Sequence, residues 1–526
     1  SNSTGNAFGD ALIGNFSQYT EADTNREGWY RFTQIEPYVQ DDWKVTSRLT
    51  LNLGFRYQYM QPQYSVLQNA VLWLPQYFDP KKAPAINPSN GAILPGNYDP
   101  YNGLALSGTD FPQDAKIRIS KASDPAIKAL FRGLPRSGAN TYWGTWGPRL
   151  GFAYDLTGKQ KSVLRGGYGV FYERIEGNFI FSAINNPPFI SQSNIYDGNI
   201  DNPGGGTTQT FPSAIANSHF LDMKAPRIMN WSLGIQHKLG AATTLDVAYV
   251  GSSSANLSRT INLNQLREGT LQKNPGVNTN ALRPYPGWAN LQLYVTGSNA
   301  NYNSLQTQVK RQIGGGGLLN VAYTWARTIT DASGYSEAPM DSYNFKRERG
   351  LATFHRAHVF VFSYIYPLPF WRTGTEWYKK ALGNWQLSGV TTLQTGLPQN
   401  IGISPDQAGI GQTGQRPNVV GEWNQGGGQR LKWFNTAAFA LPAAGTLGNL
   451  GRNVVIGPGV NNWDASLQKH FVVKERVRIQ FRAEFYDAPN HLSWWGVGNT
   501  LGNANFGQIT SATDPRTLQF GLRLGF

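Results

Sequence analysis

Cysteine is absent from this chain of 526 residues. The absence excludes a disulfide framework, a thiol nucleophile and any metal site with thiolate ligands. Charged residues are scarce as well, at 15% of the chain, against about 25% in an average soluble protein. Because aromatic residues nevertheless make up 13% of the chain, the composition argues against intrinsic disorder.

Long apolar runs are also missing. Residues 359–362 form one of the longer runs, far short of the roughly 18 residues that a transmembrane helix needs. This does not exclude a membrane β-barrel, because only alternate residues of its strands are apolar. The chain is rich in glycine, with 59 residues, and in tryptophan, tyrosine and phenylalanine, with 16, 25 and 27. That combination favours an all-β fold.

The dominant pattern has a period of two residues. Leu49 and Leu51, for example, alternate with Thr50 and Asn52. In a strand these two sets point to opposite faces, whereas in a helix the apolar set would be spread around the cylinder. The alternation recurs along the chain, and it predicts about 13 strands after residue 30. A weaker strand is expected near residues 8–14.

The lengths of the connections carry a second signal, because short turns alternate with long segments. A compact soluble domain rarely has many loops longer than about 15 residues, whereas an outer-membrane barrel has short periplasmic turns and long extracellular loops. We therefore predict one antiparallel transmembrane β-barrel of the outer-membrane type over residues 1–526. The expected extracellular loops are residues 60–146, 174–226, 252–301, 328–353, 397–459 and 488–515.

Charged residues of the strands follow the polar half of the alternation. An arginine at the lipid-facing midplane would cost roughly 2–4 kcal/mol, so we place these side chains in the barrel lumen. The lumen-facing candidates are Arg56, Arg165, Lys310, Arg478, Arg482 and Arg523.

Two segments resemble a known family. Residues 37–46 (PYVQDDWKVT) and 48–57 (RLTLNLGFRY) resemble a barrel hairpin of TonB-dependent outer-membrane receptors. Residues 518–526, with a terminal phenylalanine, are similar to the last strand of such barrels, which the barrel-insertion machinery reads. Further segments resemble the large Oar-like branch of that family, namely residues 6–14, 463–467 and 481–491.

This resemblance implies a fold and a function. Receptors of the family have a 22-stranded barrel and a globular plug preceded by a TonB box, and Oar-like members add an N-terminal β-domain. The chain would supply about 14 of those strands, without the plug or the TonB box, as the C-terminal portion of a longer receptor. The implied function is import, or alternatively export, of a large solute such as an oligosaccharide, a peptide or a metal chelate. The implied partners are outer-membrane lipid, lipopolysaccharide and, through the missing plug, the TonB complex.

Catalytic and metal sites are not expected. No catalytic dyad or triad is evident, which argues against an enzyme. His355 and His358 would face opposite sides of a strand and so could not share a metal. Residues 409–414 match a dinucleotide fingerprint in spelling, but Arg416 and Pro417 follow where a helix should begin. We therefore expect neither a metal nor a cofactor.

The net charge of +14 could suggest nucleic acid. The basic residues are spread over strands and loops rather than gathered in one stripe, so we expect contact with lipopolysaccharide phosphates and a cationic lumen instead. The loops also contain tryptophans among many amide side chains, a combination suited to capturing sugars or peptides, although loop packing and interface anchoring are the simpler explanation. The loop candidates for ligand contact are Trp143, Trp146, Trp423, Trp433, Trp494 and Trp495, with Trp288 as a further one.

Several alternatives remain open from the sequence. A propeller would show an internal repeat of about 40–50 residues, which is not evident. A complete barrel of about 14 strands could act as a passive porin, and its first strands would then pair with residues 516–526. A structural or adhesive surface protein would use its long loops to bind partners. The solute and the oligomeric state are left open.

Overall fold

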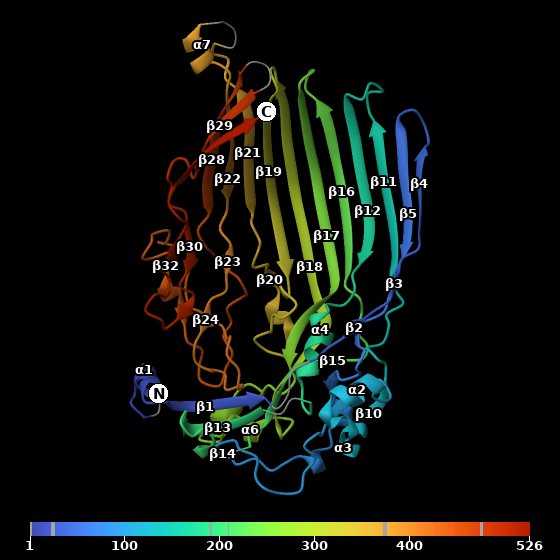
Figure 1. Cartoon of the computed structure of the whole chain (residues 1–526), viewed down its shortest axis with the longest axis vertical. Coiled ribbons are helices and arrows are strands. Elements are labelled where there is room, and N and C mark those ends of the chain that lie inside the picture. The colour runs from blue at the N-terminus through green and yellow to red at the C-terminus, as the bar shows by residue number, and fades with distance from the viewer. Residues whose placement is uncertain (1–2, 23–26, 190–191, 209, 372–375, 474–476) are drawn as a thin grey trace.

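The alternating segments of the sequence form long antiparallel strands that pair into one large sheet (Figure 1). The computed structural model describes residues 3–22, 27–189, 192–208, 210–371, 376–473 and 477–526. Within these residues, fifteen strands join the sheet, and thirteen of them form a continuous antiparallel path that we call the wall. In chain order, the wall strands are β4 (Tyr38–Lys44), β5 (Leu49–Tyr57), β11 (Trp146–Asp155), β12 (Ser162–Tyr172), β16 (Arg227–Lys238), β17 (Thr243–Asn262), β18 (Trp288–Ile313), β19 (Gly317–Thr330), β21 (His358–Pro367), β22 (Trp385–Gln394), β28 (Val460–Val473), β29 (Val477–Tyr486) and β33 (Thr517–Gly525).

The two ends of the wall differ in their connections. At one end, which we call the hairpin end, the described connections 45–48, 156–161, 239–242 and 314–316 are short turns. Gly240 adopts a φ of +80° in one of them, a conformation that glycine reaches without steric cost. At the opposite end, the loop end, the chain passes through long segments before it returns (Figure 1).

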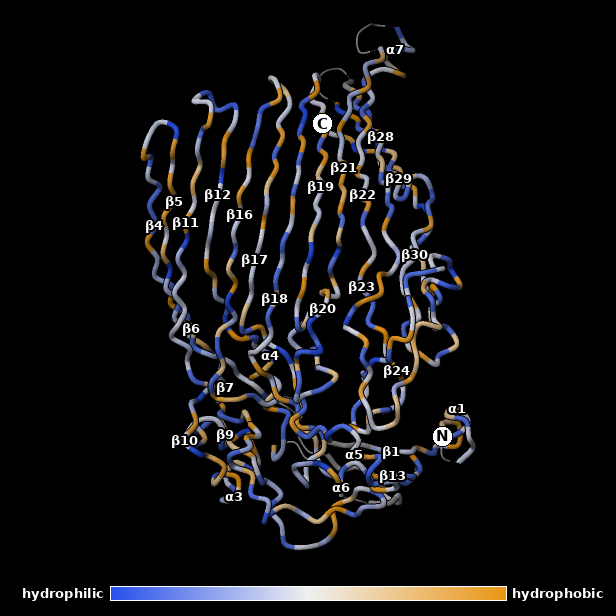
Figure 2. The backbone as a smooth tube through the Cα atoms, turned by 180° about the vertical axis from the view of Figure 1, so that it is seen from behind, coloured by the Kyte–Doolittle hydropathy of each residue, from blue (hydrophilic) through white to orange (hydrophobic). Residues whose placement is uncertain are grey.

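The pairing register defines two faces of the wall. In an antiparallel pair, directly opposed residues lie on the same face. Leu53 lies opposite Leu150, Leu150 opposite Tyr168, and Tyr168 opposite Trp231. This apolar face continues across the sheet, and Figure 2 shows the alternation of apolar and polar residues along each strand. The residues between them form the opposite, polar face.

The long segments are not structureless, because three of them pack together into a body that we call the cap. Its core contains Trp73 and Leu106 from the first long segment, Ile215 from the second, and Trp288 and Leu291 from the third. All five side chains are buried. The cap therefore has an apolar core of the kind found in water-soluble domains.

A second body, which we call the lobe, forms from the last two long segments. Ile401, Phe434, Phe439 and Val455 from one segment pack against Val497 from the other. A smaller cluster formed by Met340, Ala408, Ile410 and Leu447 joins the lobe to the segment after β19.

Short strands and helices account for the other regular elements of the described residues. The remaining strands are β1 (Asn15–Ala22), β2 (Tyr30–Arg31), β3 (Gln34–Ile35), β6 (Tyr59–Met60), β7 (Tyr64–Ser65), β8 (Val71–Trp73), β9 (Leu104–Ser107), β10 (Phe131–Leu134), β13 (Gln192–Asn199), β14 (Thr207–Thr208), β15 (Ser213–His219), β20 (Gly350–Leu351), β23 (Pro398–Gln399), β24 (Gly402–Ile403), β25 (Asn418–Val419), β26 (Phe439–Ala440), β27 (Val455–Ile456), β30 (Trp494–Val497), β31 (Thr500–Leu501) and β32 (Ile509–Ala512). The α-helices are α1 (Ala7–Leu12), α2 (Gln113–Arg118), α3 (Pro125–Lys128), α4 (Asn178–Phe181), α5 (Thr270–Lys273), α6 (Thr279–Leu282) and α7 (Trp377–Leu382). The 3-10 helices are η1 (Pro75–Tyr77), η2 (Pro80–Lys82), η3 (Ser120–Ser123), η4 (Ser182–Asn185), η5 (Pro203–Gly205), η6 (Phe345–Glu348) and η7 (Thr436–Ala438).

None of the described helices combines the length and the hydropathy that crossing a membrane requires.

Two expectations from the sequence need correction. The weak strand expected at residues 8–14 is helix α1 instead, because the Asn6 side chain accepts hydrogen bonds from the Phe8 and Gly9 backbone N–H groups and caps it. Half of the loop expected at residues 252–301 is strand, since β17 continues to Asn262 and β18 begins at Trp288. Residues 252–256 (SSSAN) are small or polar on both faces, so the alternation that reveals the other strands is interrupted there.

Candidate functional site on the polar face of the wall

The register places the six basic lumen candidates on one face. Arg165 lies opposite Ala153 and Gly234, and Lys310 lies opposite Thr244 and Asn320. Following the pairs across the wall puts all six on the polar face, away from the leucine row. The six residues are Arg56, Arg165, Lys310, Arg478, Arg482 and Arg523.

Two of these side chains have carboxylate partners close by. The Arg56 guanidinium donates to Glu36 at 2.9 Å, and Arg482 lies 3.6 Å from Glu484. That the polar face lines a water-filled lumen stays a prediction.

A basic trough lies on the polar face across β11, β12, β16, β17 and β18. It has a volume of about 560 Å³ and is lined by Arg149, Phe171, Asn230, Ser232 and Tyr302, among others. The Arg149 guanidinium sits 4.6 Å from the centre of the Phe171 ring, a cation–π geometry. The trough thus offers a planar cation, an aromatic ring, an amide and hydroxyls on one surface.

Glycine shapes the floor of the basic trough. A Cβ atom on Gly169 would lie 2.8 Å from the Phe171 ring and 3.7 Å from Arg149. The edge of the ring therefore approaches the bare backbone of Gly169, and a larger residue at position 169 would displace it. The sequence contains a signal that would place Arg149 on the polar face, because this arginine alternates with Leu150 and Phe152. Arg149 is nevertheless missing from the candidates predicted from the sequence.

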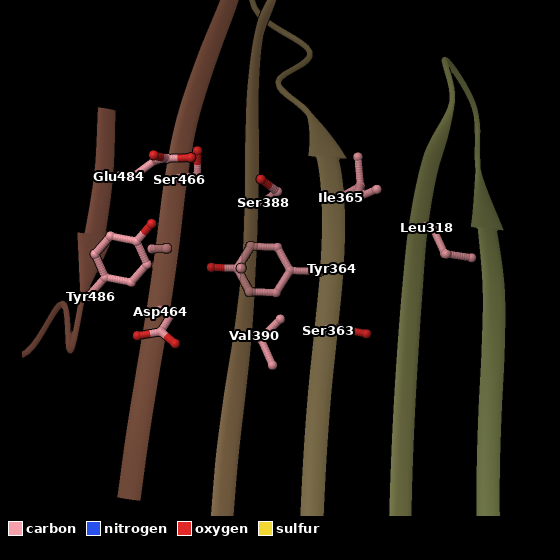
Figure 3. A pocket seen from close by; sticks show the side chains of 12 residues that line it. Leu318, Ser363, Tyr364, Ile365, Ser388, Val390, Asp464, Ser466, Glu484 and Tyr486 are labelled. Carbon is pink, nitrogen blue, oxygen red and sulfur yellow. The ribbon is translucent and has the colours of Figure 1, made fainter. Parts of the chain in front are cut away.

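An acidic trough lies on the same face across β19, β21, β22, β28 and β29. Its volume is about 360 Å³. Figure 3 shows the side chains of Asp464, Ser466, Glu484 and Tyr486 on neighbouring strands. The Asp464 carboxylate accepts hydrogen bonds from the Asp487 backbone N–H at 3.0 Å and from the Asn462 amide at 2.9 Å. The polar face therefore presents two troughs of different chemistry.

The loop tryptophans fall into two groups. Trp423, Trp433 and Trp494 are half-buried; the first two pack against the core of the lobe, and the Trp433 indole donates to the Ile456 carbonyl at 2.8 Å. Trp288 is buried in the cap, where its indole donates to the Asn102 carbonyl. These contacts have a clear role in packing.

The other three candidates, Trp143, Trp146 and Trp495, are exposed. Trp146 was expected in a loop, but it opens β11 and lies opposite Tyr57 on the apolar face, because the alternating pattern of β11 begins at this residue. Trp143 lines a pocket of about 480 Å³ together with Gln61 and Asn140. Trp143 is therefore an exposed loop tryptophan beside two amide side chains, and its contact with a ligand stays a prediction.

The histidine pair expected to be inert has separate partners. His355 lies in the turn before β21, and its Nδ1 accepts the Thr328 backbone N–H at 3.2 Å. His358 opens β21, and its Nδ1 lies 2.8 Å from the Tyr323 hydroxyl. In the part of the chain that the structure describes, no three histidine or carboxylate side chains are grouped as a metal site would require.

Comparison with known proteins gives one family. Residues 1–519 match the family described as outer membrane beta barrel domain, which confirms the predicted fold type. No curated protein matches the sequence.

Among solved structures, the chain is similar to the outer membrane transporter YddB from Escherichia coli, with 10% identity and a TM-score of 0.47 over 93% of this chain and 44% of that one. It is also similar to the ferripyoverdine receptor of Pseudomonas aeruginosa, with 10% identity and a TM-score of 0.41 over 94% and 39%. The chain is similar to the copper transporter OprC as well, with 10% identity and a TM-score of 0.42 over 94% of this chain and 49% of that one. The chain spans less than half the length of these structures.

Proposed function

The chain belongs to the outer membrane beta-barrel domain family, which is not an enzyme family, and lies in the bacterial outer membrane; from this premise we propose that it forms part of the wall of a TonB-dependent receptor. The receptor would bind a large solute and import it, with export as the alternative direction. The hairpin at residues 37–57, which resembles this receptor family, supports the proposal. Residues 463–467 and 481–491 favour the Oar-like branch.

The open sheet is the observation that carries the proposal. Within the described residues, β4 pairs only with β5, and β33 pairs only with β29. Both edges would expose unpaired backbone groups, which hydrocarbon cannot satisfy. We infer that further strands of the same polypeptide close the barrel, to a total of about 22. A passive porin made of this sheet alone would need β4 to pair with β33.

The orientation follows from the two kinds of connection. Short turns of outer-membrane barrels face the periplasm and long loops face outward, so the cap and the lobe are extracellular in this proposal. Lipopolysaccharide then surrounds the loop end. Coupling to the TonB complex would use a plug and a TonB box supplied by a part of the receptor outside this chain. No nucleic acid is involved.

The polar face supplies candidate contacts for the solute. The basic trough pairs a guanidinium with an aromatic ring beside amide and hydroxyl groups, which suits an oligosaccharide, a peptide or the acidic groups of a metal chelate. Trp143 in its amide-lined pocket would make the first contact at the cell surface. These residues bind and select, and none of them performs covalent chemistry.

Uptake by cells that carry the full-length protein tests the proposal. A panel of oligosaccharides, peptides and metal chelates is offered to such cells, with and without a working TonB complex. Uptake that requires the TonB complex supports the receptor. Uptake that survives without it, or a permanently open conductance of the purified protein in planar bilayers, favours the porin. The absence of uptake combined with cell-surface adhesion favours an adhesive protein.

Binding measurements on Arg149 test the basic trough. Arg149→Ala removes the cation over Phe171, and we expect a loss of solute affinity on the order of tenfold, equivalent to about 1.4 kcal/mol. Arg149→Lys keeps the charge but not the planar stack, so it should restore only part of the affinity. Arg523→Ala, a basic residue of the polar face outside the trough, is the matched control. Equal losses in Arg149→Ala and Arg523→Ala would argue against a local site.

A further inference from the structure

One connection at the hairpin end differs from the others. Residues 368–384 join β21 to β22, and they contain helix α7, which projects beyond the turns (Figure 1). The other described turns at this end have six residues or fewer. A tight hairpin would suffice to join two antiparallel strands, so the extra length is not required by the wall.

A lysine on the apolar face holds the C-terminal end of α7. Lys469 lies opposite Trp385 and Phe481 in the register, among residues that face away from the troughs. It is nevertheless only 1% exposed, because its ammonium group donates to the carbonyl oxygens of Ala381 at 2.7 Å and Gly383 at 2.6 Å. The last carbonyls of a helix lack partners within the helix, and a cation there is also favoured by the helix dipole.

Aromatic rings complete this attachment. The Lys469 ammonium lies 4.8 Å from the Phe471 ring centre and 5.4 Å from that of Trp385. The Trp385 indole N–H donates to the Ala381 carbonyl at 3.3 Å. Since Lys469, Trp385 and Phe471 all belong to the apolar face, α7 is fastened to the outside of the wall rather than to the lumen side.

The helix and the described residues before it present large apolar side chains to the surroundings. Trp377 is 78% exposed, and Phe370, Trp371 and Leu382 are also exposed. Lys379, half-buried, lies next to them and pairs with Glu376 at 3.1 Å. Such a cluster would be unfavourable in water, but tryptophan, tyrosine and lysine are the residues found at the boundary between lipid headgroups and acyl chains.

We propose that α7, together with Phe370 and Trp371, is a membrane anchor that inserts into the headgroup region of the phospholipid leaflet at the hairpin end. The anchor continues the apolar face of the wall, which already contacts lipid in an outer-membrane barrel, so both surfaces share one partner. Membrane contact follows from the family and from this geometry. Only the identity of the leaflet, the periplasmic one, rests on the proposed orientation of the receptor.

Single-cysteine variants give a direct test, because this chain contains no cysteine and any cysteine in the rest of the polypeptide is first replaced by serine. Trp377→Cys is labelled with an environment-sensitive nitrobenzoxadiazole dye in the full-length protein, reconstituted into vesicles of phosphatidylethanolamine and phosphatidylglycerol. Lipids with a nitroxide at the headgroup or deep in the acyl chain serve as quenchers. Lys159→Cys, in the turn between β11 and β12, is the control at the same end, and Leu233→Cys, on the apolar face, reports insertion of the wall.

The label positions separate the outcomes. In preparations where deep nitroxides quench the Leu233 label, the Trp377 label should emit at shorter wavelength than the Lys159 label and be quenched most by headgroup nitroxides. A Trp377 label that emits like the Lys159 label and is not quenched would overturn the anchor. Transport is not needed for this readout, so failure of the proposed receptor function would leave a quenched label, and the anchor, in place.

A second variant tests the attachment itself. Lys469→Met keeps an unbranched side chain on the apolar face but cannot donate to the helix carbonyls. We expect the Trp377 label to lose quenching and to show lower fluorescence anisotropy, because α7 is no longer held against the wall. Unchanged quenching and anisotropy would contradict the assigned attachment.

Discussion

Leucine behaves differently in the wall and in the cap. The exposed fractions of three wall leucines are 37% for Leu53, 54% for Leu150 and 51% for Leu233. The corresponding fractions of three cap leucines are 1% for Leu72, 1% for Leu104 and 0% for Leu291. The cap buries its leucines against other side chains. The wall exposes its leucines on its surface, so their apolar surroundings must come from outside the protein. In an outer-membrane protein that solvent is lipid.

The difference separates two sources of stability. The wall is held by ladders of backbone hydrogen bonds, which hydrocarbon strengthens by offering no competing partner. The cap is held by removal of apolar surface from water, at roughly 25 cal/mol per Å². The two regions should therefore respond to different kinds of substitution, and this contrast can be tested.

Removal of a large side chain from the cap core should have the largest effect. Trp73 is fully buried and makes an edge-to-face contact with Tyr285 at 4.7 Å. Trp73→Ala should cost about 3–5 kcal/mol of cap stability, because of lost burial and the cavity left behind. Protease cleavage of the cap should accelerate while the wall keeps its heat-dependent electrophoretic shift. Trp495→Ala, at an exposed position, is the control and should leave cleavage unchanged.

A buried ion pair should come next. Arg416 donates to Glu348 at 2.9 Å and 3.1 Å, and both side chains are buried where the segment after β19 meets the lobe. Glu348→Ala leaves the guanidinium buried without its counter-charge, so we expect a loss of about 3–5 kcal/mol. Urea denaturation followed by proteolysis of the lobe measures this loss.

An exposed pair provides the matched control for this prediction. Lys116 and Asp110 lie 3.4 Å apart on the surface of the cap, and Asp110→Ala should cost about 0–1 kcal/mol. Equal losses from the buried and the exposed pair would contradict a role for burial.

Charge insertion tests the wall. Leu233→Arg places a cation on the apolar face of β16 and should destabilise the membrane-inserted barrel by roughly 2–4 kcal/mol. Ser232→Arg places the same cation one residue away, on the polar face, and should have an effect near zero. Denaturant unfolding of the protein in vesicles compares the two variants. Similar destabilisation by both would show that the two faces do not meet different solvents.

The same contrast explains how much the sequence could reveal. The strands that contain Leu53 and Leu150 were predicted because every second residue must face lipid, which leaves a local pattern of period two. The six basic residues on the polar face follow from that same pattern. Residues 252–262 lack the pattern because they extend beyond the apolar band of the wall. The sequence therefore predicts a loop from residue 252 onward, whereas β17 continues to Asn262.

Other features depend on contacts between distant segments. The cap core joins Trp73 to Ile215 and Leu291, and nothing in the local sequence around any of them specifies the other two. The troughs have the same character, since Arg149 and Tyr302 belong to strands far apart in the chain. For Trp423 and Trp433 the sequence marks the residue but not its role. A tryptophan in a loop has the same sequence signal whether it binds a ligand or packs against the lobe.

Acidification should produce the smallest effect, confined to the cap. His219, at the end of β15, is fully buried, its Nδ1 lies 3.2 Å from the Phe220 carbonyl, and burial lowers its pKa from 6.5 to about 4. Between pH 6.5 and 4, the unfolded cap binds a proton that the folded cap excludes. Stability is therefore complete above pH 6.5 and falls with pH, by about 2 kcal/mol at pH 5.

Substitution separates this titration from general acid effects. His219→Gln removes the titrating group, so the loss of cap stability between pH 6.5 and 5 should shrink by about 2 kcal/mol, even if the variant is less stable at neutral pH. His491→Gln alters an exposed histidine and should leave the pH profile unchanged. The wall has no part in this equilibrium, because its stability depends on backbone pairing within the bilayer. If the unfolding of the wall showed the same dependence on pH, the cap and the wall would unfold as one unit. Their different surroundings would then not give them separate stabilities.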